Sequence, residues 1–158
     1  MKQQRGFVLI EAMVAILIFS LGILGMVAMG GTAVTAQSDA QYRTEAAALA
    51  EDIASNIALN AGLPGTPVFQ ANVLSYVHLP TGACGAFAGA PSANPNVLAW
   101  VAKATAAGTG LPGATTTSQQ IVITAPPADF NRIDITVCWR APSDQAWRRL
   151  SLVKYVIS

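Results

Sequence analysis

The sequence predicts an α+β protein in which a long N-terminal helix packs on a small antiparallel sheet near the C-terminus. Three observations support this fold class. An uncharged apolar run occupies residues 12–29, an amphipathic helical pattern follows to about residue 59, and alternating apolar segments occupy the last third of the chain. A chain of 158 residues has room for about one domain of ordinary size.

The apolar run carries one acid at its front edge. Residues 12–29 are eighteen in a row without a charge, which meets the length of a membrane helix. Glu11 lies just before them. A carboxylate in hydrocarbon costs a few kcal/mol, so Glu11 is a candidate functional residue. The alternative is that Glu11 marks the point where the helix surfaces into the lipid headgroups.

The second half of the helix is amphipathic. Gly30 and Gly31 each lower helix propensity by about 1 kcal/mol, which favours a bend or local melting there. The helical pattern then resumes, and Gly62 followed by Pro64 ends a helix of about residues 7–59. Its apolar positions recur every three or four residues, at Tyr42, Ala46, Leu49, Ile53 and Ile57. This face must pack on the rest of the chain.

The remaining residues predict loops, one short helix and a sheet of about three or four strands. Residues 63–92 are rich in Gly, Pro and Ala, and we interpret them as a loop with minor structure. Asn94 before Pro95 is typical of an N-cap and opens a helix to about Ala104. Strand-like patterns occupy residues 119–124, 132–140 and 147–157.

Two cysteines lie 54 positions apart, at Cys84 and Cys138. Lys2 and Arg5 favour a cytoplasmic N-terminus, so the chain beyond the apolar run is expected outside the cytoplasm, where the two can form a disulfide. Cys138 alternates with the apolar positions of its strand, so this bond would hold the preceding loop across the outer face or edge of the sheet. The alternative is two buried free thiols.

The composition argues against several kinds of function. There is no Cys-x-x-Cys pair, and the one histidine, His78, is expected to be a surface or packing residue, so we expect no metal site. The net charge is +1 and no basic stripe exists, so nucleic acid is not an expected partner. No nucleophile elbow, P-loop or dinucleotide fingerprint is present, so we expect neither an enzyme nor a cofactor.

The first residues form a signal of their own. A short basic leader ends in Gly6, the aromatic Phe7 follows, and Glu11 comes four positions later. This pattern resembles the class III signal of type IV prepilins, and residues 16–25 look most like the PilV type of minor pilin. The proline common in the anchor of major pilins is missing, which favours a minor subunit. The resemblance is specific for residues 1 to about 30, and beyond them it extends only to the order of elements of a pilin-like fold.

The resemblance implies three parts: a leader peptide (1–6), a hydrophobic transmembrane and assembly helix (7–35) and a periplasmic or extracellular head (36–158). A prepilin peptidase would cut between Gly6 and Phe7 and methylate the new amine of Phe7. In a filament, Glu11 of a neighbouring subunit would pair with that amine. Within one chain the amine and Glu11 are also one turn apart, so an intrachain pair is the alternative.

The resemblance also implies location and partners. The chain would span the inner membrane once, with a cytoplasmic N-terminus and a periplasmic head, and then enter the pilus at the cell surface. Its partners would be the prepilin peptidase and methyltransferase, other minor pilins, the major pilin, the inner-membrane assembly platform and, before assembly, membrane lipid. A complex of minor pilins would start pilus assembly near the tip and support adhesion and twitching motility.

Two other functions remain open from the sequence. A minor pseudopilin of a type II secretion system would share the signal, the anchor and the helix. A secreted soluble binding protein would instead lose residues 1–36 as an ordinary signal peptide, with Val34-Thr35-Ala36 as the cleavage site. Against the second, the apolar segment exceeds the usual length of about 7 to 15 residues and carries Glu11.

Overall fold

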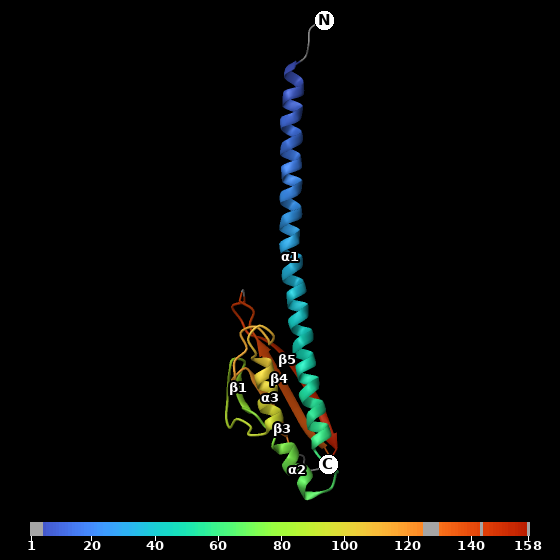
Figure 1. Cartoon of the computed structure of the whole chain (residues 1–158), viewed down its shortest axis with the longest axis vertical. Helices are drawn as coiled ribbons and strands as arrows, with labels where there is room; N and C mark the ends of the chain where they lie inside the picture. The colour runs from blue at the N-terminus through green and yellow to red at the C-terminus, as the bar shows by residue number, and fades with distance from the viewer. Residues whose placement is uncertain (1–4, 125–129, 143, 158) are drawn as a thin grey trace. The chain divides into compact units, whose positions relative to one another are not determined.

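A computed structural model describes residues 5–124, 130–142 and 144–157, and the side chains of residues 8–124, 131–142 and 144–156. The chain divides into two compact units, Met1–Gln41 and Tyr42–Ser158. Helix α1 (Arg5–Asn60) begins in the first unit and ends in the second, and every other helix and strand belongs to the second unit (Figure 1).

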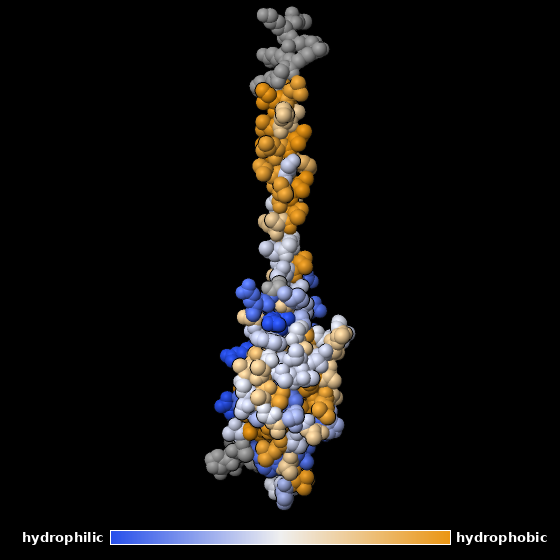
Figure 2. Space-filling view, turned by 90° about the vertical axis from the view of Figure 1, so that its left-hand side faces the viewer, coloured by the Kyte–Doolittle hydropathy of each residue, from blue (hydrophilic) through white to orange (hydrophobic). Residues whose placement is uncertain are grey.

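In the first unit, α1 presents apolar side chains to its surroundings on every side. All side chains of residues 8–37 are exposed, and the face in Figure 2 is almost entirely hydrophobic along the apolar run. Among the described residues, α1 is the one helix that is long and apolar enough to cross a membrane. It stays helical through Gly30 and Gly31, where the hydroxyls of Thr32 and Thr35 donate hydrogen bonds to the carbonyls of Met29 and Gly31.

The core of the second unit lies between α1 and the sheet, as the amphipathic pattern predicted. One face of α1 is buried at Ala46, Leu49, Ala50, Ile53 and Ile57, and Tyr42 packs against the same core. Beside partly buried neighbours, the inner face of the sheet contributes five large apolar side chains that are at most 1% exposed. These residues are Ile121, Ile133, Ile135, Val137 and Trp139.

The sheet has three antiparallel strands in the order β3-β4-β5. They are β3 (Gln119–Thr124), β4 (Phe130–Trp139) and β5 (Arg148–Ile157). The sequence predicted all three to within two residues. Strand β4 ends one residue before the predicted Arg140, because the Arg140 amide donates to the Pro112 carbonyl outside the sheet (2.9 Å).

Helix α3 (Pro95–Ala104) confirms the cap predicted from its sequence. The Asn94 side chain accepts a hydrogen bond from the Asn96 amide (3.0 Å). The buried Trp100 indole donates to the Leu49 carbonyl (2.9 Å), which holds α3 against α1.

Residues 63–92 contain more regular structure than the predicted loop. Helix α2 (Pro67–Leu74) has proline in its first turn and buries Phe69 and Val73, four residues apart on one face. A two-stranded hairpin follows, with β1 (Thr81–Ala83) paired to β2 (Ala86–Ala88). Strands of three residues are too short to leave an alternating pattern, which is why the sequence did not predict them.

Residues 79–89, which we call the strap, lie across the outer face of the sheet. The Phe87 amide donates to the Thr117 carbonyl (3.0 Å), and the Gln120 side chain of β3 donates to the Leu79 carbonyl (2.9 Å). A disulfide joins Cys84 of the strap to Cys138 of β4, with Cα atoms 5.6 Å apart. Cys138 is therefore fully buried although it faces away from α1, because Leu79 and Phe87 cover it.

Candidate functional site at the start of helix α1

The residues with predicted roles in processing and assembly all lie in the first turns of α1. Gly6 and Phe7 belong to the helix, and the described side chains begin at Val8. Glu11 follows Phe7 by four residues, so the two positions lie one helical turn apart, about 6 Å along the axis. An amine created at Phe7 and the carboxylate of Glu11 would therefore lie on the same side of the helix, one above the other.

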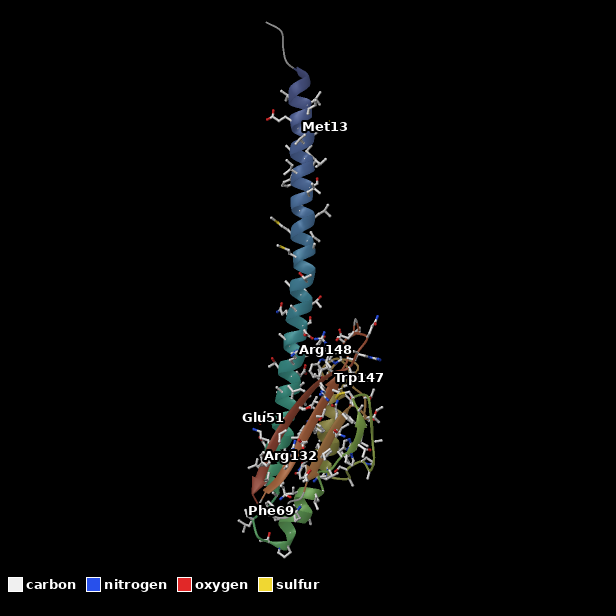
Figure 3. All side chains as sticks on the ribbon, turned by 180° about the vertical axis from the view of Figure 1, so that it is seen from behind. Met13, Glu51, Phe69, Arg132, Trp147 and Arg148 are labelled. Atoms are coloured by element: carbon white, nitrogen blue, oxygen red, sulfur yellow. A yellow bond between two sulfur atoms is a disulfide. The ribbon has the colours of Figure 1, made fainter. Side chains whose placement is uncertain are left out.

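Glu11 is a solitary charge on an apolar surface. Its side chain is exposed, and within the described part of the chain its carboxylate makes no ion pair or hydrogen bond. Its neighbours along the helix are large apolar side chains that are more than half exposed, such as Leu9, Ile10 and Met13, the last labelled in Figure 3. In hydrocarbon, an unpaired carboxylate is costly, so this position favours a cationic partner.

The surface around Glu11 continues for several turns without a polar face. The exposed large apolar side chains of this part of α1 are Val8, Leu9, Ile10, Met13, Val14, Ile16, Leu17, Ile18, Phe19, Leu21, Ile23, Leu24, Met26, Val27, Met29 and Val34. A helix that is apolar all round is suited to lipid or to a bundle of other apolar helices. This part of α1 can therefore anchor the chain in a membrane.

His78 is a packing residue of the second unit. It is 4% exposed, its backbone pairs with Ile121 of β3, and its Nδ1 accepts a hydrogen bond from the Ser92 amide (3.1 Å). Burial lowers the pKa of the imidazole, and the Thr116 backbone opposes part of that shift. No group of three or more His, Cys, Asp or Glu side chains in the described ranges is gathered so that it could hold a metal ion.

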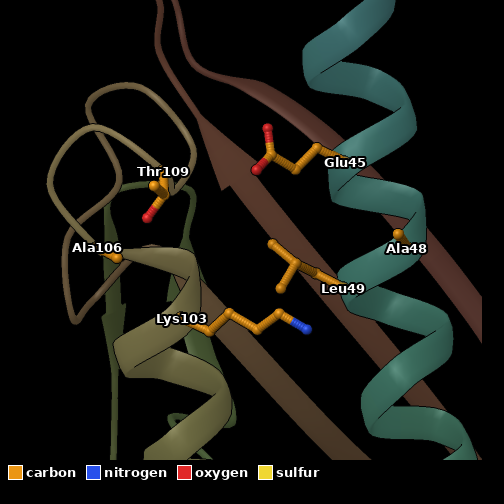
Figure 4. Close-up of a pocket in the computed structure, with 6 residues that line it drawn as sticks. All are labelled: Glu45, Ala48, Leu49, Lys103, Ala106 and Thr109. Carbon is orange, nitrogen blue, oxygen red and sulfur yellow. The ribbon is translucent and has the colours of Figure 1, made fainter.

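Sequence reasoning missed a groove between α1 and α3 in the second unit. It has a volume of about 240 Å³ and is lined by Glu45, Ala48, Leu49, Lys103, Ala106 and Thr109 (Figure 4). Glu45 and Lys103 extend into it from opposite walls. Nothing in the spacing of the sequence places α3 beside α1, so these residues come together only in the fold.

The N-terminal signal has an independent counterpart among known families. Residues 1–27 match the family model described as the prokaryotic N-terminal methylation motif. The match supports a type IV pilin-like or pseudopilin signal at the N-terminus of the chain. It also places Gly6, Phe7 and Glu11 inside the matched segment, while the second unit lies beyond it. No curated protein and no solved structure matches the chain.

Proposed function

We propose that this chain is a minor pilin of a type IV pilus, most similar to the PilV type. The observation that supports this most strongly is the methylation motif at residues 1–27, with Gly6, Phe7 and Glu11 at the positions of a prepilin signal. The motif opens a helix whose apolar side chains are exposed on all sides. The chain is then a subunit that is cleaved, anchored in the membrane and assembled into the filament.

In this proposal, a prepilin peptidase cleaves the bond between Gly6 and Phe7 at the cytoplasmic side of the inner membrane. Glycine suits the position because a residue without a side chain lets the peptide backbone approach an active site closely. Cleavage removes Lys2 and Arg5 and leaves the apolar run as the anchor. Methylation of the Phe7 amine completes the mature subunit.

Assembly then gives Glu11 its role. In a bundle of apolar helices, the Phe7 amine of an entering subunit pairs with Glu11 of a neighbour, and the pair offsets the cost of two separate charges in a medium of low dielectric. The exposed apolar surface that follows Glu11 supplies the contact area between neighbouring helices. Other minor pilins and the major pilin are the partners, and the inner-membrane assembly platform is the site of entry. The completed complex starts the pilus near its tip and supports adhesion and twitching motility.

Replacing Glu11 by glutamine tests this proposal. The Glu11→Gln chain should insert in the membrane and be cleaved like wild type, because neither step uses the charge pair. Methylation of Phe7 or recovery of the chain in sheared filaments should fall strongly. Glu51→Gln is the matched control, since Glu51 lies on the same helix but in the second unit. Incorporation of Glu11→Gln at the wild-type level would contradict the proposed role.

A minor pseudopilin of a type II secretion system carries the same kind of motif. Affinity purification of the tagged full-length chain from its membrane distinguishes the two functions. Recovery with pilus subunits and the pilus assembly platform is the result that we expect. Recovery with a secretion complex alone would assign the chain to that system instead.

A further inference from the structure

The groove between α1 and α3 combines apolar walls with an unpaired acid. Ala48, Ala106 and Leu49 give the groove apolar lining, and Thr109 adds a hydroxyl. The Glu45 carboxylate extends into this space (Figure 4). Lys103, on the opposite wall, is already bonded to Asp52 of α1 (3.1 Å). The three ionised groups leave the groove with a net charge of −1.

Most other charged groups among the described side chains of the second unit lie in ion pairs. Arg132 pairs with Asp134 (2.8 Å), and Lys154 pairs with Glu51 (3.1 Å). Arg148 pairs with Asp144 (2.6 Å). Within the described side chains, Glu45 and Arg149 are the acid and the base of this unit for which no ion pair, hydrogen bond or ring contact is found.

Arg149 belongs to a basic corner where β4 ends and β5 begins. The corner also contains Arg140, which lies over the Trp147 ring (5.2 Å to its centre), and Arg148; Figure 3 labels Trp147 and Arg148 side by side. Asp144 neutralises Arg148, so the corner keeps a net charge of about +2. Arg149 is exposed and stands on β5 opposite Cys138 of β4.

We propose that the α1–α3 groove is a docking site for the basic corner of a second copy of this chain, with Arg149 of that copy entering the groove and pairing with Glu45. The evidence is charge complementarity within one sequence: a groove of net negative charge and a corner of net positive charge, each holding an ionised group without a partner. An arginine suits the groove because its methylene stem packs on apolar walls while its guanidinium pairs with a carboxylate in a bidentate geometry.

The contact has a defined symmetry. The groove and the corner are different surfaces of the second unit, so each copy offers one surface to each of two neighbours. Such a heterologous contact repeats along a row or ring of copies instead of closing into a two-fold pair. This contact goes beyond the proposed function, because it gives a binding role to two surfaces of the second unit. It does not depend on the pairing of Phe7 with Glu11.

A zero-length cross-link tests the contact in full-length protein embedded in membrane vesicles. A carbodiimide couples carboxylates to amines and does not couple them to guanidinium groups, so the test uses Arg149→Lys, which keeps the charge. Light and isotope-heavy copies of this variant are mixed before coupling. The expected result is a mixed light–heavy peptide pair that joins Glu45 to the new lysine. The same link should disappear in the double variant Arg149→Lys with Glu45→Gln. It should persist in the control double variant, Arg149→Lys with Glu51→Gln.

In the Arg149→Lys protein, the ion pairs Lys103–Asp52 and Lys154–Glu51 are internal positive controls for the coupling reaction, because each should form a cross-link within one chain. If these two links form and the mixed link of Glu45 to residue 149 does not, the proposal is overturned. A mixed link from residue 149 to any other carboxylate, or a link from Glu45 to a different protein only, also overturns it.

Discussion

At the scale of single residues, Gly85 explains how the strap is held against the sheet. Its backbone has φ of +81°, a conformation that favours glycine, and an added Cβ would overlap the ring of Trp147. The missing side chain lets Trp147 pack beside the cluster of Cys84, Cys138, Leu79 and Phe87. The Arg140 guanidinium lies over the same ring, 5.2 Å from its centre.

Gly85→Ala should therefore destabilise the second unit by about 1–3 kcal/mol more than a substitution with backbone strain alone. Gly108→Ala is the matched control, because Gly108 has the same φ of +81° and an added Cβ would meet nothing within 4 Å. The control should lose only about 1–2 kcal/mol. Denaturant midpoints of the full-length chain in detergent, followed by tryptophan fluorescence, measure both, and equal losses would contradict the packing role of Gly85.

His78 predicts a dependence of stability on pH. Burial lowers the folded-state pKa of His78, so the unfolded chain binds a proton at a higher pH than the folded chain does. Stability should be complete above about pH 6.5 and should fall as the pH drops below that value, by at most about 1.4 kcal/mol per pH unit. Protonation also removes the Nδ1 acceptor of the Ser92 amide.

His78→Asn is the variant that tests this prediction, because its side-chain oxygen can replace Nδ1 as the acceptor but does not titrate. Its unfolding free energy should change less than that of wild type between pH 7 and pH 5. Identical pH profiles of the two proteins would show that His78 is not the titrating group.

At the scale of elements, α3 depends on a side chain that makes two contacts. The Asn94 oxygen caps the helix at the Asn96 amide, and its Nδ2 donates to the Ser75 hydroxyl (2.8 Å). Asn94→Ala should cost about 1–2 kcal/mol, since it removes both. Asn94→Asp keeps the cap and loses only the second donor, so thermal unfolding should rank it between alanine and wild type. An aspartate variant as unstable as the alanine variant would contradict the importance of the cap.

Elements with a strong periodic pattern could be predicted from the sequence, and short ones could not. The long helix, α3 and the three strands of the sheet follow from spacing, caps and turn residues. Helix α2 and the strap were missed as regular structure, because their order comes from contacts made elsewhere in the chain, such as those of Phe87 with Thr117 and of Gln120 with Leu79. The α1–α3 groove was missed for the same reason.

At the scale of the whole molecule, the disulfide of Cys84 and Cys138 closes a loop with a sequence separation of 54. In the chain-entropy model, a loop of this length contributes about 3–5 kcal/mol. Replacing both cysteines by alanine should lower the unfolding free energy of the second unit by that amount, and the wild-type protein under reducing conditions should lose the same. A variant as stable as oxidised wild type would show that the strap is held by packing alone.

The N-terminal signal could be recognised from the sequence, because it lies in a short run of residues and needs no tertiary contact, and the roles of its residues stay predictions. Gly6, Phe7 and Glu11 lie within a few residues of one another, and the matched family model covers the same segment. The role of the second unit could not be predicted in the same way, because its surfaces depend on how distant segments pack. The second unit also lies beyond the matched residues.

The mass of the mature N-terminus shows whether the chain is processed as a prepilin. Protein purified from the membrane of a cell with a prepilin peptidase should begin at Phe7 with a methylated amine and should retain the apolar run. A mature chain that begins at Gln37 would instead show an ordinary signal peptide, and an intact chain that begins at Met1 would show no processing. Either of these two results would contradict processing as a prepilin.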